Sequence, residues 1–363
     1  METKYSYLVR LTPLAPYFFG GENTFDEGTK ANYLARSNQM PSQATLLGVM
    51  RYVVLRQRGL LGLKNQAACE KAIGPSSFSF DQSTAPEGRE ADYGIIARLS
   101  PLFLRDNKEG DYFTAMPLDD SMDFGMEAGR SYLSGKVLDA IPCARDLNVK
   151  TYDHYLHFVN PDCERLADRL KERYPNESAL QSVFHEEEQI GITKNKKERH
   201  GTDEDAFFKQ VLVTLHADLS FAFVVETYEP IQTETDMVFM GANRSMFKIE
   251  ISQPDSLPDF FATDEKNYFA RLARPDRYLL LSDAYLQPEL WQKARFVWGQ
   301  AVAYRAIKSQ VRNGLSWKKP KKSALYRLQA RGSVLWGAQL DALLTMPAFQ
   351  QVGWNMYVAP SKK

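Results

Sequence analysis

Residues 5–13, YSYLVRLTP, decide how this chain begins to fold. Apolar side chains stand at every second position, Tyr5, Tyr7 and Val9, and more polar residues lie between most of them. This alternation predicts a β-strand with one buried face. The strand should end near Pro13, where a polar excursion rich in Gly and Asn begins.

The next regular element is a helix that is predicted to start at Pro41-Ser42. Ser42 is expected to cap it, because a serine hydroxyl can accept a hydrogen bond from a free N–H of the first turn. An apolar face at helical spacing follows, formed by Leu46, Leu47, Met50, Val53 and Val54.

The second half of the chain is rich in predicted strands. Residues 211–215 and 221–225 alternate on either side of Ala217-Asp218, which predicts a hairpin. Strand-like runs also occur at 93–99, 112–116, 247–251, 278–282, 333–336 and 353–358, and an amphipathic helix at 164–173.

Length and element order together predict an α+β fold with two ferredoxin-like (RRM-like) domains. A chain of 363 residues exceeds one average domain, and 44% hydrophobic with 25% charged residues is typical of a globular protein with a real core. The predicted domains are 1–190 and 191–363. The region from roughly 76 to 188 is interpreted as insertions on the first domain.

The cysteines and the N-terminal segment favour a cytoplasmic protein. Cys69, Cys143 and Cys163 are odd in number and widely spaced, which argues against a disulfide framework or a cysteine-rich zinc site. The first 21 residues lack the unbroken apolar stretch of a signal peptide, and no later run is long enough to span a bilayer. We expect no membrane, metal or cofactor.

The net charge is zero, but the carboxylates are unevenly distributed. Residues 28–69 contain no Asp or Glu, and neither do residues 290–340, where about six would be expected at average frequency. Both windows are rich in Lys and Arg. A carboxylate beside a phosphate path cancels the attraction of a neighbouring cation, so the windows predict a single cationic track for a nucleic acid. The alternative is two ordinary surfaces that lack acids.

Short motifs along the chain resemble a known family. They are Phe18-Phe19-Gly20-Gly21-Glu22, Arg36-Ser37-Asn38, Pro41-Ser42-Gln43-Ala44-Thr45-Leu46-Leu47-Gly48, Ile73-Gly74-Pro75, Gly191-Ile192-Thr193, Met240-Gly241-Ala242-Asn243-Arg244 and Lys319-Pro320-Lys321 ahead of Gly332-Ser333-Val334. Their order resembles that of the third Cmr subunit of type III-B CRISPR complexes. That family belongs to the RAMP superfamily, in the group that holds the 5′ handle of the guide RNA.

The resemblance implies paired ferredoxin-like domains with a protruding thumb and no catalytic residues. It also implies contacts to guide RNA, to the large polymerase–cyclase subunit and to the first backbone subunit. Two segments depart from the family pattern: Gly241-Ala242-Asn243 replaces a doubled glycine and a glutamate, and 350–354 is less glycine-rich. Residues 77–188 do not align with the family.

The residues predicted to grip RNA combine cations for phosphates with amides for base edges or the 2′-hydroxyl. Ser42 adds the N–H groups of a helix start. For the lysines in 194–199 the competing interpretation is a solvated loop. Tyr33, Trp317 and Tyr326 lie among these charges and could stack on bases, with core packing as the competing interpretation. The set is Arg36, Asn38, Gln43, Arg51, Lys194, Lys196, Lys197, Arg244, Lys319, Lys321 and Arg331.

Three other functions stay open at this point. Some RAMP relatives cleave RNA, so a guide-processing endoribonuclease is possible, with His200 in a basic loop as the candidate base. A structural assembly protein would turn its cationic windows toward acidic neighbours. The third alternative is the equivalent subunit of another type III subtype. No nucleotide-binding loop, His-Glu-x-x-His motif or nucleophile elbow occurs.

Overall fold

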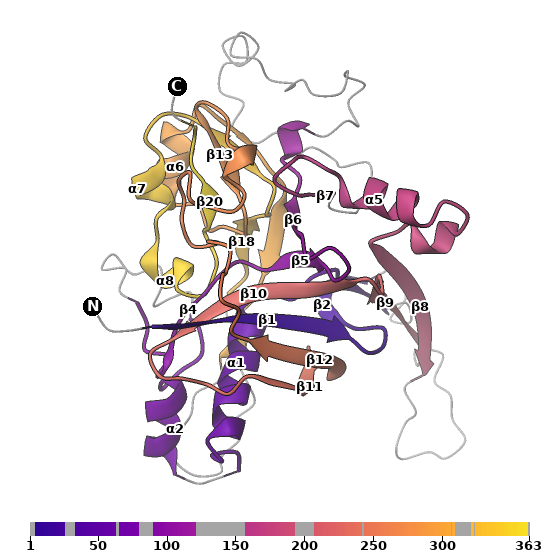
Figure 1. The fold of residues 1–363 in the computed structure, drawn as a ribbon, viewed down its shortest axis with the longest axis vertical. Helices are drawn as coiled ribbons and strands as arrows, with labels where there is room; N and C mark the ends of the chain where they lie inside the picture. Colours follow the sequence, from indigo (N-terminus) through magenta and orange to yellow (C-terminus); the bar gives the residue numbers. More distant parts are fainter. Residues whose placement is uncertain are drawn as a thin grey trace.

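The structure is a computed structural model that describes residues 4–25, 33–62, 65–79, 90–120, 157–192, 207–241, 243–305, 307–308, 321–322 and 324–361. It is a mixed α+β fold dominated by antiparallel strands, as the sequence predicts (Figure 1). The finer ferredoxin-like division remains a prediction.

The largest sheet gathers strands from distant parts of the chain. Its order is β11-β12-β1-β10-β5-β6-β7, and β4 also pairs with β10. The strands are β1 (Tyr5–Pro13), β4 (Ile96–Leu99), β5 (Phe103–Asp106), β6 (Tyr112–Ala115), β7 (Phe158–Val159), β10 (Leu219–Thr227), β11 (Glu234–Met240) and β12 (Ser245–Ser252).

Helix α1 (Gln43–Gln57) packs on one face of this sheet, and α2 (Gln66–Ile73) lies against α1. The predicted cap is confirmed, because the Ser42 hydroxyl accepts a hydrogen bond from the Thr45 N–H. The predicted apolar face is also confirmed: Leu46, Leu47, Met50, Val53 and Val54 are all buried.

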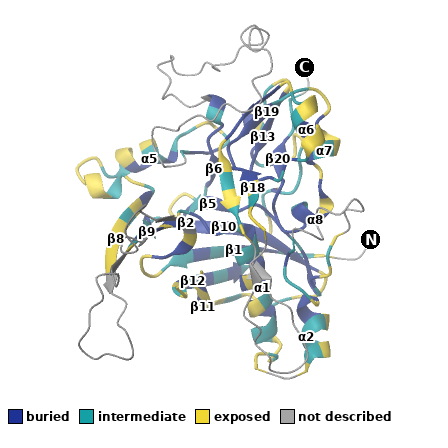
Figure 2. Ribbon diagram, turned by 180° about the vertical axis from the view of Figure 1, so that it is seen from behind, coloured by how far each residue is buried: buried dark blue, intermediate teal, exposed yellow. Residues whose placement is uncertain are grey.

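A second sheet has the order β2-β3-β9-β8 and extends to the side of the molecule (Figure 1). Its strands are β2 (Phe19–Phe25), β3 (Tyr33–Asn38), β8 (Phe184–Ile192) and β9 (Phe207–Leu215). Most of β8 is exposed (Figure 2). Before β8 come helix α5 (Leu166–Arg173) and the short turn η3 (Ser178–Leu180).

The C-terminal part forms a third sheet, ordered β14-β19-β13-β20, and two two-stranded ribbons, β15-β18 and β16-β17. The elements are η5 (Ala270–Leu272), β13 (Arg277–Leu280), α6 (Pro288–Lys293), β14 (Phe296–Trp298), β15 (Ala301–Tyr304), β16 (Ile307–Lys308), β17 (Lys321–Lys322), β18 (Tyr326–Gln329), β19 (Val334–Trp336), α7 (Asp341–Leu344), α8 (Pro347–Gln350) and β20 (Tyr357–Val358); η1 (Leu118–Asp120) follows β6.

The predicted hairpin between 211–215 and 221–225 is wrong in its pairing. Both strands exist, but β9 pairs with β3 and β8, while β10 pairs with β1, β4 and β5. The chain passes from the second sheet to the central sheet at the intervening turn. There the His216 N–H donates to the Val183 carbonyl oxygen (3.0 Å), next to the start of β8. Local alternation identifies strands but does not select their partners.

The sheets do not follow the predicted boundary at residue 190. β1 lies between β10 and β12, so strands from both predicted domains form one continuous sheet. Strands β4 and β5 fall inside 76–188 and pair directly with β10. Residues 96–106 of that region therefore contribute strands to the central sheet, while the domain boundary itself remains a prediction.

Candidate nucleic-acid interface

Three of the sequence motifs, far apart along the chain, meet at one end of the central sheet. The Phe18 N–H donates to the Ser245 hydroxyl (3.1 Å), just after the turn that joins β11 to β12. Gly241 in that turn has a φ of +73°, and a Cβ atom added there would clash with the Phe18 carbonyl oxygen. Only a glycine allows this approach without strain. The 240–244 motif is therefore tied to the 18–22 motif.

The 36–38 motif joins the same group through hydrogen bonds across β2 and β3. The Phe19 N–H donates to the Ser37 hydroxyl (2.8 Å), which is buried. The Asn38 side-chain amide donates to the Gly20 carbonyl oxygen (2.8 Å) and stays exposed. One polar side chain thus fixes the strands while the next remains at the surface.

Three residues of the predicted RNA-gripping set lie on this exposed surface. They are Arg36, Asn38 and Arg244. Arg36 forms an ion pair with Glu186 of β8 (3.3 Å), although 45% of its side chain is exposed. Arg244 lies with its guanidinium 5.6 Å from the ring centroid of Phe239, a cation–π contact. All three can still contact a ligand.

Gln43 lies in the interior instead. Only 1% of it is exposed, and its amide nitrogen donates to the carbonyl oxygens of Gly353 (3.1 Å) and Ser100 (3.5 Å). A buried amide that satisfies two carbonyl groups holds chain segments together and does not reach a base edge. This position is a correction to the predicted set: Gln43 joins the start of α1 to the C-terminal segment.

Arg331 is also buried, with 5% of the residue exposed. Its Nη1 donates to the Leu102 carbonyl oxygen (3.1 Å) and lies 3.4 Å from the Met40 sulfur, and its Nε lies 3.5 Å from the Asp283 carboxylate. The guanidinium is thus surrounded by protein acceptors. The prediction that Arg331 contacts a phosphate directly is therefore corrected. Its contact with Met40 places the end of β18 beside the end of β3.

Arg51 is only partly exposed and is already bonded to the protein, and its contact with RNA remains a prediction. Its guanidinium donates to the carbonyl oxygens of Ile73 (3.2 Å) and Gly74 (3.3 Å), at the end of α2. Burial lowers the pKa of Arg51, and the effect of nearby Tyr93 opposes this only in part. The side chain works as a C-terminal anchor for α2, because arginine donors suit the free carbonyl groups there.

The arginines of the first acid-free window are paired with carboxylates from other parts of the chain. Arg56 bonds to both Glu234 and Asp236 of β11, and Arg58 bonds to Glu229. Acids that are remote in sequence therefore neutralise these cations. The prediction that both windows form one cationic track is corrected for Arg56 and Arg58.

The second acid-free window differs, because it contains a ribbon with an open cationic face. β15 and β18 pair so that Val302, Tyr304 and Leu328 face the core, and the Tyr304 ring packs edge-on to Trp354 (5.0 Å). The opposite face carries exposed Ala301, Ala303 and Arg327, and exposed Arg305 follows β15. Within the described part of the chain, neither Arg305 nor Arg327 meets a carboxylate.

Several predicted residues cannot be placed. Lys194, Lys196, Lys197, Lys319 and His200 lie outside the described residues. Lys321 belongs to β17, where its backbone pairs with Lys308 of β16. These assignments remain predictions.

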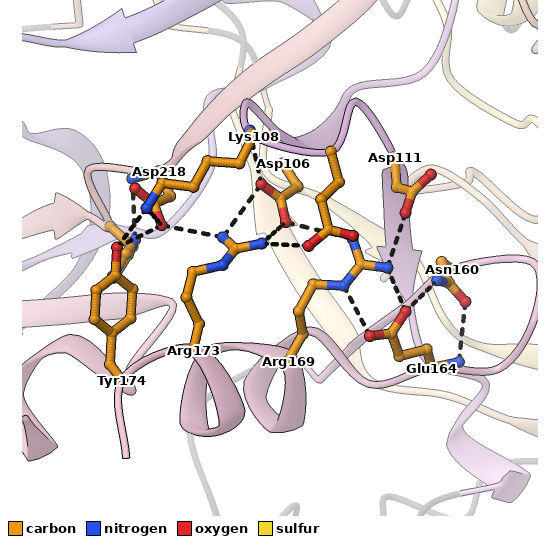
Figure 3. Close-up of polar contacts among 11 residues, drawn as sticks. Asp106, Lys108, Asp111, Asn160, Glu164, Arg169, Arg173, Tyr174 and Asp218 are labelled. Carbon is orange, nitrogen blue, oxygen red and sulfur yellow. Dashed lines mark hydrogen bonds and ion pairs between the residues drawn. The ribbon is translucent and has the colours of Figure 1, made fainter. Parts of the chain in front are cut away.

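A dense ion-pair cluster between α5, the end of β5 and the start of β10 was not anticipated from the sequence (Figure 3). Arg169 and Arg173, one turn apart on α5, both bond to Asp106, whose side chain is completely buried. Arg173 also reaches Asp218 (3.0 Å), which directly follows β9 and its turn. In the sequence, the only indications of this cluster were the two arginines one turn apart and the acidic stretch at 106–111. Contact between the arginines and the acids depends on the tertiary fold.

Hydrogen bonds in this cluster set the charge state of its acids. Burial raises the pKa of Asp106, but bonds from Arg173, the Lys108 N–H and Arg169 outweigh it and hold the pKa below its usual range. The pKa of Asp218 is lowered in the same way, by Tyr174, Lys108 and Arg173. The cluster is therefore fully charged near neutral pH and fixes α5 to the start of β10.

His216 has the environment of a core side chain. His216 is buried, its Nδ1 accepts the Asp218 N–H (3.0 Å), and burial lowers its pKa. Among the described residues, no three His, Cys, Asp or Glu side chains are arranged to hold a metal ion. No described helix has the length and apolar character needed to cross a membrane.

Comparison with protein families matches residues 9–353 to the family described as "CRISPR-associated protein (Cas_Cmr3)". The chain belongs to the Cas_Cmr3 family. The resemblance inferred from the short motifs is thereby confirmed. No curated protein matches the sequence significantly.

Solved structures similar to this Cas_Cmr3 family member include two chains at 12% identity. One comes from a cryo-EM structure of the type III-B Cmr-beta complex bound to cognate target RNA and AMPPnP; the match covers 97% of this chain and 96% of that chain, with a TM-score of 0.48. The other comes from the Cmr-beta complex bound to cognate target RNA, with 92% and 88% covered and a TM-score of 0.47.

Proposed function

We propose that this chain is a non-catalytic RNA-binding subunit of a cytoplasmic type III-B (Cmr) CRISPR ribonucleoprotein. In this proposal it holds the 5′ handle of the guide RNA and docks the large polymerase–cyclase subunit and the first backbone subunit. Family membership supports the CRISPR assignment. Docking of the two subunits rests on the family resemblance alone.

The single observation that carries RNA binding is the outer face of the β15–β18 ribbon. Arg305 and Arg327 are exposed there, and in the described structure no carboxylate neutralises them. Ala301 and Ala303 present only methyl groups beside Arg327 on that face, so a polyanion can approach the backbone of β15 closely. Attraction of this kind, between unpaired cations and phosphates, supplies most of sequence-independent nucleic-acid affinity.

The neighbouring β3 end supplies groups that can act on the sugar or base. Arg331 links the ribbon to Met40, two residues beyond Asn38. Asn38 keeps its amide at the surface, where it can donate to a 2′-hydroxyl or a base acceptor. In the proposed arrangement, the RNA phosphates lie along the β15–β18 ribbon, and the end of the RNA strand passes over β3.

The test is the salt dependence of single-stranded RNA binding by the full-length protein. Replacing Arg305→Ala together with Arg327→Ala should weaken binding and lower the slope of log affinity against log salt by about 1.4, since each lost phosphate contact on a single strand contributes about 0.7. The matched control is Arg56→Ala with Arg58→Ala, which removes two arginines that are already neutralised. Equal losses in both variants, or none in the first, would contradict the proposal.

A further inference from the structure

One edge of the central sheet leaves an apolar face uncovered. On the inner face of β11, Val238 and Met240 are buried in the core cluster that also contains α1 residues. The outer face presents Phe239, 59% exposed, and Met237, 54% exposed, with Met246 directly opposite Phe239 on β12. Large apolar side chains that are exposed next to one another are a common feature of binding surfaces.

Cations surround this apolar face. Arg244 lies above the Phe239 ring, and Lys248 is opposite Met237 in the strand register. Lys248 and Arg10 of β1 share a single carboxylate, that of Glu250, at 3.2 and 3.1 Å. Three cations therefore face one acid on the outer side of β11, β12 and β1.

We infer that this outer face binds an unpaired base of single-stranded RNA, which stacks on Phe239 while Arg244 contacts the adjoining phosphate. The inference rests on the proposed RNA-binding function and deepens it by naming a base-stacking site. A sheet covered by a helix on one face, with an exposed aromatic on the other, is a geometry that binds unpaired nucleotides.

The turn that carries Arg244 is well suited to hold a ligand in place. Its contact with Phe18 through Gly241 fixes the turn against the second sheet. Arg244 itself has a φ of +53°, and its N–H donates to the Gly241 carbonyl oxygen (3.2 Å). The guanidinium is therefore presented from an anchored backbone, which reduces the entropy lost on binding.

The excess of positive charge favours RNA over a protein partner with an apolar surface. Aromatic residues, Met and Arg are common in protein interfaces, but Lys is depleted there, so Lys248 beside the apolar groups is the feature that favours a polyanion. A polyanion with exposed bases matches both the ring and the surrounding charges.

The experiment measures binding of the full-length protein to a fluorescein-labelled single-stranded RNA of mixed sequence, by anisotropy at several salt concentrations. Phe239→Ala should weaken binding by about five- to 150-fold, the range for loss of one stacked base, without changing the salt slope. Arg244→Ala should weaken it and lower the slope by about 0.7. Phe239→Trp should retain affinity and gain a fluorescence signal that RNA quenches.

The matched control is Phe261→Ala, because Phe261 also lies under an arginine, Arg98, at 3.9 Å, but Arg98 belongs to β4, which β10, β1 and β12 separate from β11. That variant should bind RNA like the wild type. If Phe239→Ala folds normally and also binds like the wild type, the inference is wrong; loss of subunit association in that variant would identify a protein-docking face instead. If the wild-type protein itself fails to bind RNA, the proposed function and this site both fail.

Discussion

Gly241 packs so closely against the carbonyl oxygen of Phe18 that no side chain fits between the two backbones. The contact joins the β11–β12 turn to the strand that leads into the second sheet. The 18–22 and 240–244 motifs, more than two hundred residues apart, therefore meet through a glycine and a backbone carbonyl group. The surface that carries Arg244 and Asn38 is built on this contact.

Gly241→Ala is therefore expected to destabilise the protein by about 1–3 kcal/mol, from the left-handed backbone and the clash with Phe18 together. Urea unfolding measures the change. Gly48→Ala provides the control, because Gly48 lies in α1 with nothing within 4 Å of an added Cβ. It should leave stability unchanged or raise it by up to about 1 kcal/mol. A neutral Gly241→Ala variant would show that the turn can move freely.

The acids around Arg169 and Arg173 predict how stability changes with pH. Asp106, Asp218 and Glu164 all have lowered pKa values in the folded protein. Their stabilising contribution is complete above the unfolded pKa of about 4, and it is lost as the pH falls through the lower folded values. The free energy of unfolding should thus fall steeply below about pH 4.

Asp106→Asn should cost about 3 kcal/mol at pH 7, because it leaves two partly buried arginines short of a completely buried carboxylate. It should also flatten the loss of stability in acid. Lys171→Ala, which removes an exposed ion pair with Asp168 on the same helix, should change stability by less than about 0.5 kcal/mol. Chemical denaturation between pH 3 and about 7 compares the three proteins. An Asp106→Asn protein with an unaltered pH profile would contradict this role.

Glu186 lowers the positive potential around Arg36, since the two groups form an ion pair. Glu186→Gln is expected to raise RNA affinity by about twofold to fivefold at low salt, with less effect at high salt, where charges are screened. Glu187→Gln is the comparison, because the Glu187 carboxylate bonds to Thr214 and not to an arginine. Equal gains in the two variants would mean that general charge, not release of Arg36, is responsible.

Gln43→Ala should reduce stability by about 1–3 kcal/mol, since the Gly353 and Ser100 carbonyl oxygens lose a buried donor. RNA affinity measured under folded conditions should stay within about twofold of wild type. A large affinity loss in a fully folded Gln43→Ala protein would restore Gln43 to the RNA-contacting set.

Local chemistry explains which parts of the fold could be predicted. The α1 cap depends on Ser42 and Thr45, three residues apart, and the strand β1 on its own alternation, so both were predicted correctly. The partners of β10 could not be predicted, because β1 lies more than two hundred residues away. Sequence proximity suggested β9 instead.

The candidate site shows the same division. Residue type indicated Arg36, Asn38 and Arg244 as surface groups, and all three are exposed. Type alone did not reveal that Gln43 and Arg331 are buried, or that Glu234, 178 residues away, neutralises Arg56. Phe239 was missed, because exposure of an aromatic in an alternating strand depends on what covers the sheet.

The most direct test of RNA binding by the proposed interface is photocrosslinking of the assembled complex to a guide RNA with photoreactive nucleotides in its 5′ handle. Peptide mapping should place the crosslinks in the β15–β18 ribbon, at the end of β3 and in the β11–β12 turn. Crosslinks confined to α2 or to the C-terminal helices α6–α8, with none in those three segments, would contradict the account.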